Sequence, residues 1–343
     1  MYVEPERAIA KPEEKIMFEW LGLLGNVVIL VAALIALDRA SGLTISNSVN
    51  LTGVTGFGKT TIGFILVAFS TSLPELFVAI FAVIQPDNVG VSIGNVLGSN
   101  IVNICLILGV CFVLMALKCP NRICFLPTMA KEEMGSLYFG LLVASIVPLT
   151  LLYIGYASQF MGVVLLAVFI FYLYQLSKIR NVKEEGALGA EKEKTRRYTI
   201  LAILGAVGTV VSAFFIVESA SFIATSVGIP KVVIGATIIA FGTSVPELAT
   251  SVEAVRKKHL DLALGNIVGS CFINITCILG VTLLASPLRI NMSAFSDVAM
   301  FSLVTNVLLW YFLSSEKIGW REGAVLLFIY SIFLAISFSG YKF

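Results

Sequence analysis

Two acidic side chains lie inside long apolar segments of this 343-residue chain, and each directly follows a proline. They are Glu75, after Pro74, and Glu247, after Pro246. A charge at the centre of a bilayer costs at least about 2.5 kcal/mol, so such a glutamate needs a partner or a function. Each proline lacks the N–H that would bond the carbonyl one turn earlier, and its ring opens the helix there. Freed carbonyls in a membrane line cavities or bind ions, so both positions predict a cation site.

Neutral oxygen-bearing residues accompany both glutamates at helical spacing. Thr71, Ser72 and Glu75 share one helix face, and polar side chains recur every four residues in the next apolar segment. The cluster comprises Ala68 (through its carbonyl), Thr71, Ser72, Asn95, Ser99 and Asn103, with Ala240, Thr243, Ser244, Asn266, Ser270 and Asn274 in the second half. Hard cations such as Ca²⁺ and Na⁺ prefer these ligands, and the absence of His and Cys from the cluster argues against Zn²⁺ or Cu⁺. The alternative is that these polar groups only join helices by hydrogen bonds.

The composition indicates a polytopic membrane protein. Hydrophobic residues make up 58% of the chain and charged residues 13%, with a net charge of +2 and a mean hydropathy of +0.97. This excludes a disordered chain, a basic nucleic-acid binder and an ordinary cytosolic enzyme. A spanning helix needs about 20 apolar residues. Ten segments satisfy that length, at 17–37, 60–84, 91–117, 136–155, 158–177, 199–226, 232–255, 262–286, 297–314 and 322–340.

The two halves of the chain contain the same sequence twice. IGFILVAFSTSLPEL at 62–76 and IGATIIAFGTSVPEL at 234–248 share 9 of 15 positions. GNVLGSNIVNICLILGV at 94–110 and GNIVGSCFINITCILGV at 265–281 share 10 of 17 positions. The copies begin in the second and seventh spans, which are five positions apart, and because five is odd the copies cross the membrane in opposite directions. Inverted repeats of this kind mark secondary transporters, which bind their ions near the midplane.

The basic residues predict the orientation of the chain. Seventeen of the 23 lysines and arginines fall in the connections on one side, which the positive-inside rule places in the cytoplasm. Both termini are then extracellular, and we expect a multi-pass protein of the plasma membrane. The domains predicted are a first five-helix repeat at 1–178, a charged cytoplasmic linker at 179–198 and a second five-helix repeat at 199–343. Gly94 and Gly98, with Gly265 and Gly269, predict close helix approach.

The paired blocks FSTSLPEL with GNVLGSNIVN and FGTSVPEL with GNIVGSCFIN resemble the repeats of the cation/Ca²⁺ antiporter superfamily, in particular a compact prokaryotic Na⁺/Ca²⁺ exchanger. The resemblance implies an all-α fold of ten helices, with broken core helices 2, 3, 7 and 8 and sliding helices 1 and 6. It implies that both glutamates bind Ca²⁺ with the carbonyls of Thr71 and Thr243, while serines and alanine carbonyls bind Na⁺. The implied ion ligands are Ala68, Thr71, Ser72, Glu75, Ser99, Asn103, Ala240, Thr243, Ser244, Glu247, Ser270 and Asn274.

Two positions depart from the family pattern. Ser70 stands where the family usually has glycine, matched in the second copy by Gly242. Asn274 stands where K⁺-dependent relatives have Asp, so the resemblance implies exchange without K⁺.

The function predicted is exchange of Na⁺ for Ca²⁺ by alternating access, without a cofactor. An H⁺/Ca²⁺ exchanger, in which protons on Glu75 and Glu247 replace Na⁺, is the alternative, and a passive cation channel is the less favoured one. The partners expected are Ca²⁺, Na⁺ and lipid, without nucleic acid; the sequence does not determine the oligomeric state. We expect no enzymatic activity, because no nucleophile–base pair or cofactor motif is evident.

Other signals are weaker. Residues 53–60, GVTGFGKT, match the phosphate-loop pattern, but that motif needs an α/β sheet, so we expect no nucleotide binding. Cys105, Cys111, Cys271 and Cys277 lie in apolar segments, where cysteine is typically a small hydrophobe. Glu218 either pairs inside the bundle or lines the ion path.

Overall fold

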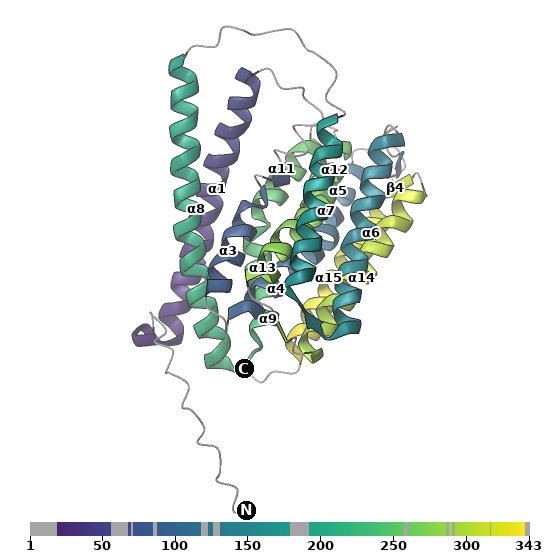
Figure 1. Ribbon diagram of the computed structural model, residues 1–343. Coiled ribbons are helices and arrows are strands. Elements are labelled where there is room, and N and C mark those ends of the chain that lie inside the picture. Colours follow the sequence, from purple (N-terminus) through teal and green to yellow (C-terminus); the bar gives the residue numbers. More distant parts are fainter. Residues whose placement is uncertain are drawn as a thin grey trace, which may run out of the picture.

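The computed structural model describes residues 19–55, 68–69, 71–84, 88–117, 123–125, 131–178, 192–256, 260–285, 288–289, 292–315 and 317–339. Within these ranges the chain is almost wholly helical (Figure 1).

The first half contains a short 3₁₀ turn, η1 (Glu19–Leu21), and then α1 (Gly22–Thr55), α3 (Leu73–Ile84), α4 (Val89–Ile101), η3 (Val102–Leu108), α5 (Gly109–Ala116), α6 (Lys131–Ile154) and α7 (Gln159–Lys178). The second half contains α8 (Lys192–Val227), α9 (Lys231–Ile234), η5 (Gly235–Ile239), α10 (Ala240–Thr243), α11 (Val245–Arg256), α12 (Leu260–Ile273), η6 (Asn274–Ile278), α13 (Leu279–Ala285), α14 (Met292–Ser314) and α15 (Trp320–Ser339).

Six helices in the described part are long and apolar enough to cross a membrane. A seventh is the bent pair Lys231–Thr243 and Val245–Arg256. Three shorter apolar helices, Leu73–Ile84, Tyr138–Ile154 and Gln159–Tyr174, coincide with the remaining predicted segments. The prediction of a helical, multi-span membrane protein is confirmed. The count of ten spans stays a prediction.

The helices α1 and α8 pack against each other as an antiparallel pair beside the other helices (Figure 1). Both are longer than predicted, because helix α1 continues to Thr55 and α8 begins at Lys192, inside the predicted linker. The hydropathy of a segment indicates how well it suits a lipid environment, whereas the length of a helix also depends on the helix propensity of the residues beside that segment. The residues before the α8 span, KEKTRR, are mostly good helix formers, so the helix extends beyond the apolar stretch.

Of the breaks predicted in the core helices, the structure shows the one in the seventh span, whereas the third and eighth spans run without a break. In the seventh span the axis bends by 46° between Thr243 and Val245, immediately before Pro246. The third and eighth spans contain no proline and continue through π-helical segments, η3 and η6. A π-helical segment widens the helix without ending it and is frequent at functional sites.

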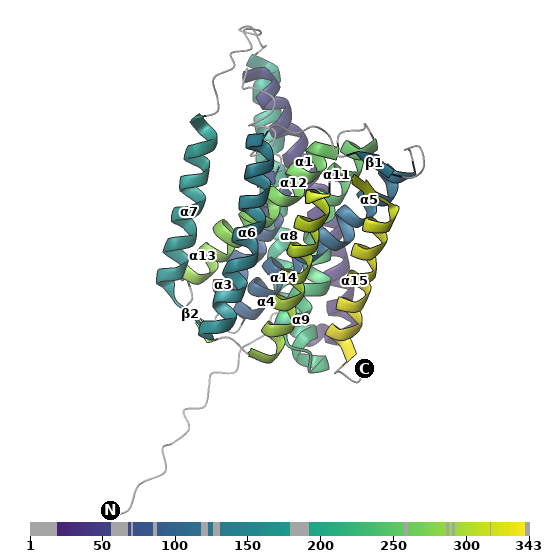
Figure 2. The same ribbon diagram turned by 90° about the vertical axis from the view of Figure 1, so that its right-hand side faces the viewer.

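Two kinds of contact between the halves occur twice, the second time with the roles of the two halves exchanged. Strand β1 (Ile123–Phe125) pairs with β4 (Lys317–Gly319), and β2 (Tyr156–Ala157) with β3 (Leu288–Arg289). The two pairs lie at opposite ends of the molecule (Figure 2). A Cβ on Gly323 would lie 2.7 Å from the Gly109 carbonyl oxygen, and one on Gly162 would lie 2.8 Å from that of Gly280. Gly109 and Gly280 occupy the same position of the repeated block.

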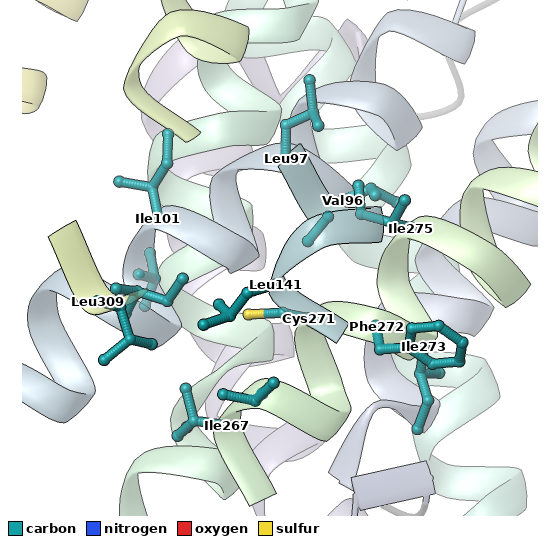
Figure 3. Packing of buried hydrophobic residues seen from close by; sticks show 14 of the residues in the cluster. Val96, Leu97, Ile101, Leu141, Ile267, Cys271, Phe272, Ile273, Ile275 and Leu309 are labelled. Carbon is teal, nitrogen blue, oxygen red and sulfur yellow. The ribbon is translucent and has the colours of Figure 1, made fainter. Parts of the chain in front are cut away.

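The largest buried cluster of apolar side chains lies between α4, α6, α12 and α14 (Figure 3). Leu97 and Ile101 of α4 pack there with Ile267 and Phe272 of α12 and with Leu309 of α14. This apolar packing joins α4 and α12, the two helices that carry the repeated GN-x-x-GS motif.

Candidate ion-binding site

The structure buries all twelve residues that the sequence implicates as ion ligands. Each has at most 2% of its surface exposed. They belong to the first turns of α3 and α11 and the residues just before them, to the π-helical segments and to α4 and α12. Burial of so many polar groups in an apolar bundle is costly unless they have partners.

The two glutamates begin new helices. Glu75 lies in the first turn of α3 and Glu247 in the first turn of α11. Pro74 and Pro246 occupy the first turn as well, where a missing N–H removes no helical hydrogen bond. The partial positive charge of a helix N-terminus stabilises a carboxylate placed there. Ser244, three residues before Glu247, contacts Glu75, so the two halves of the chain meet at this point.

Each carboxylate uses one oxygen for a long hydrogen bond from a serine. Ser244 Oγ donates to Glu75 Oε1 over 3.3 Å, and Ser270 Oγ contacts Glu247 Oε1 at 3.5 Å. Among the described residues, Oε2 of both glutamates has no hydrogen-bond partner, and no basic side chain pairs with either. Two neighbouring carboxylates that lack a counter-ion require a bound cation or protons to balance their charge.

The carbonyls of Ala68 and Ala240 are in equivalent surroundings. Thr71 Oγ1 donates to Ala68 O over 3.2 Å, and Thr243 Oγ1 donates to Ala240 O over 3.3 Å. Each carbonyl also accepts the backbone N–H four residues later, over 3.1 Å. A carbonyl oxygen has two lone pairs. Both lone pairs are used here, so an ion that binds either alanine carbonyl would displace the hydrogen bond from the threonine hydroxyl.

A further amide, outside the predicted ligand set, extends the cluster. Asn274 Nδ2 donates to Asn100 Oδ1 over 3.3 Å, which joins η6 to α4. Asn100 is fully buried. Its counterpart in the second copy is Cys271, so repeat symmetry could not reveal it; its place beside Ser99 in the polar motif was the available signal.

The backbone of helix α4 lies directly against the backbone of the segment that precedes Glu247. A Cβ on Gly94 would lie 2.1 Å from the Val232 carbonyl oxygen, and a Cβ on Gly98 would lie 2.3 Å from two backbone atoms of Ala236. The predicted close approach at these two glycines is confirmed. For Gly265 and Gly269 it stays a prediction.

The structure also places the weaker signals. Cys105, Cys111, Cys271 and Cys277 are buried free thiols, as predicted. Glu218, in α8, is 6% exposed and interacts within the described structure, so both of its predicted roles stay open. Residues 53–55 of the phosphate-loop pattern end helix α1, where that motif needs a strand. Residues 56–60, Ser70 and most of the linker, 179–191, lie outside the described residues.

Comparison with known proteins assigns the chain to a family. The model of the family described as sodium/calcium exchanger protein matches residues 25–178 and 197–339. The chain belongs to this family. It is therefore a transporter-family protein and not an enzyme.

The transporter has relatives that span nearly its whole length. The sodium/calcium exchanger MaX1 of Methanosarcina acetivorans is 30% identical, over 91% of this chain and 98% of its own. The inner membrane protein YrbG of Escherichia coli K12 is 29% identical, over 82% and 87%.

Solved structures show the same fold. The sodium-calcium exchanger NCX_Mj is 29% identical, with a TM-score of 0.60 over 92% of this chain and 99% of its own. The H⁺/Ca²⁺ exchanger CAX has a TM-score of 0.71 over 94% of this chain and 91% of its own, but only 16% identity, so this likeness concerns the fold alone.

Proposed function

We propose that this transporter exchanges Na⁺ for Ca²⁺ by alternating access at a midplane site built around Glu75 and Glu247. The observation that carries the proposal is the burial of both glutamates where the two halves meet, each with a carboxylate oxygen that lacks a partner among the described residues. Two carboxylates balance one Ca²⁺, and the surrounding hydroxyl, amide and carbonyl oxygens suit both Ca²⁺ and Na⁺. Competition of the two ions for one set of oxygens produces exchange.

The proposed ligands are the twelve residues implicated by the sequence. Both glutamates bind Ca²⁺ together with the carbonyls of Thr71 and Thr243. The serines and the carbonyls of Ala68 and Ala240 bind Na⁺, each alanine carbonyl releasing its threonine hydroxyl. Structures of NCX_Mj soaked with Na⁺ and Ca²⁺ or Sr²⁺ support these ions as substrates.

The proposed architecture is ten spans in two inverted five-helix repeats, joined by the linker 179–198. The exchanged strand pairs at opposite ends of the molecule and the equivalent glycine contacts support this arrangement. We place the linker in the cytoplasm and both termini outside, because 17 of the 23 basic residues fall on the linker side. The relative YrbG is named an inner membrane protein, which supports a location in the cytoplasmic membrane.

The coupling ion is tested by ⁴⁵Ca²⁺ uptake into proteoliposomes loaded with Na⁺ and diluted into Na⁺-free buffer at clamped, equal pH. We expect uptake that requires internal Na⁺ and saturates with external Ca²⁺. Uptake driven only by an imposed pH gradient would assign the transporter to H⁺/Ca²⁺ exchange instead. Uptake that is indifferent to both gradients would contradict antiport and favour a channel.

The bend before Glu247 supplies a further test. In a Pro246→Ala variant, residue 246 regains an N–H that can bond the Gly242 carbonyl, which favours a straight helix. A straight helix would move Glu247 away from the other proposed ion ligands. We expect Ca²⁺ affinity to fall about tenfold, equivalent to about 1.4 kcal/mol. Pro148→Ala is the matched control, because Pro148 lies inside α6 and outside the proposed site. Equal Ca²⁺ affinities for the two variants would contradict a role for the bend.

A further inference from the structure

We propose that Asn95 is a positioning residue that holds the Thr243 hydroxyl for ion binding, and that its repeat counterpart Asn266 has no such role. The inference rests on the proposed function, because it concerns the same site. Thr243 Oγ1 donates to Asn95 Oδ1 over 3.1 Å, and both residues are fully buried. They are 148 residues apart and belong to opposite halves of the chain.

The contact gives the Thr243 hydroxyl an acceptor outside its own helix. A hydroxyl has one proton and two lone pairs. Thr243 Oγ1 lies 3.1 Å from Asn95 Oδ1 and 3.3 Å from the Ala240 carbonyl oxygen, and either oxygen can accept its proton. When an ion takes the Ala240 carbonyl, Asn95 can still accept the Thr243 proton, so Asn95 keeps Thr243 and its ion-binding carbonyl in place.

The equivalent residue in the second copy has different partners. Asn266 Nδ2 donates to Thr250 Oγ1 over 3.0 Å and to Ser251 Oγ over 3.1 Å, both in α11. The hydrogen bond that the structure gives the Thr71 hydroxyl goes to its own helix, at Ala68 O. The two halves of the site are therefore not equivalent in how they hold their threonines.

The two halves also differ in the residues that this asparagine meets. At the offset of 172 that relates the first repeated block, Thr250 corresponds to Val78 and Ser251 to Ala79. Helix α3 therefore has no hydroxyl at the positions that bind Asn266 in α11. Asn95 lacks a partner of this kind in its own half and bonds across to Thr243, whereas Asn266 is held within its own half.

The test measures the half-saturating Ca²⁺ concentration for uptake and the rise in thermal unfolding temperature that Ca²⁺ produces. Asn95→Ala frees the Thr243 hydroxyl to rotate, and we expect the half-saturating concentration to rise about fivefold to tenfold, the usual effect of one lost hydrogen bond. Asn266→Ala is the matched control, with an expected change of less than about twofold and a lower unfolding temperature. If Asn95 acts through Thr243, Asn95→Ala adds nothing to the effect of Thr243→Ala.

A second variant tests the inference with Asn95 intact. Val78→Thr with Ala79→Ser installs the hydroxyls of the second copy in α3, and the Val78 change is nearly isosteric. We expect these hydroxyls to draw Asn95 from Thr243 and to weaken Ca²⁺ binding as Asn95→Ala does. Unchanged Ca²⁺ binding in both variants would overturn the inference, as would an equal loss in Asn266→Ala or additivity with Thr243→Ala.

The two proposals fail in distinguishable ways. A wild-type protein without Na⁺-dependent uptake would contradict the proposed exchange. Thermal stabilisation by Ca²⁺ would still report on Asn95, because that measurement needs binding and not transport.

Discussion

Replacement of either glutamate by glutamine is expected to lower Ca²⁺ affinity by at least about a hundredfold. At an effective dielectric of about 20, one unit charge 4 Å away contributes about 4 kcal/mol, and Ca²⁺ carries two charges. Glu75→Gln and Glu247→Gln keep the size and one carbonyl oxygen but remove the charge. The loss is therefore expected for each single variant, as measured by ⁴⁵Ca²⁺ uptake and by thermal stabilisation with Ca²⁺.

Thermal unfolding of the same variants without ions distinguishes an effect on folding from an effect on ion binding. Each substitution removes one of two buried carboxylates that have no basic partner among the described residues, so the ion-free variants should unfold at the wild-type temperature or above it. Glu253→Gln is the matched control: it makes the same change in the same helix, α11, at an exposed position. Wild-type Ca²⁺ affinity in either single variant would contradict the site.

Gly98→Ala is expected to destabilise the protein by about 3 kcal/mol or more, at the upper end of overpacking effects. The added Cβ would lie 2.3 Å from the Cα and the carbonyl oxygen of Ala236. Both are backbone atoms, so no side-chain rotation relieves the clash, and α4 must separate from η5. Thermal unfolding in detergent measures the loss.

The control for this change is Gly42→Ala in α1, where an added Cβ meets nothing within 4 Å. There the higher helix propensity of alanine favours the folded state by up to about 1 kcal/mol. Gly98→Ala should also weaken Ca²⁺ binding, because Ser99 moves with its neighbour. Equal stability of the two variants would show that the helices do not need this close approach.

Much of the fold follows from local pattern. Apolar segments of spanning length predicted a helical membrane protein, and the duplicated blocks predicted which residues belong to one site. Both signals are local, because they depend on the types and spacing of residues along one segment. Helix ends were less accurate: α1 and α8 extend past their apolar stretches, since helix propensity and hydropathy are different properties.

The sequence by itself determined the identity of the buried polar residues, because charges, prolines and hydroxyls inside apolar segments stand out by type alone. Tertiary structure decided which of them pair. Symmetry of the repeats would give Asn95 and Asn266 equivalent partners, yet one bonds Thr243 and the other bonds Thr250 and Ser251. A hydrogen bond between residues far apart in the chain depends on how closely two helices approach and cross. That geometry results from packing of the whole bundle, which no single segment specifies.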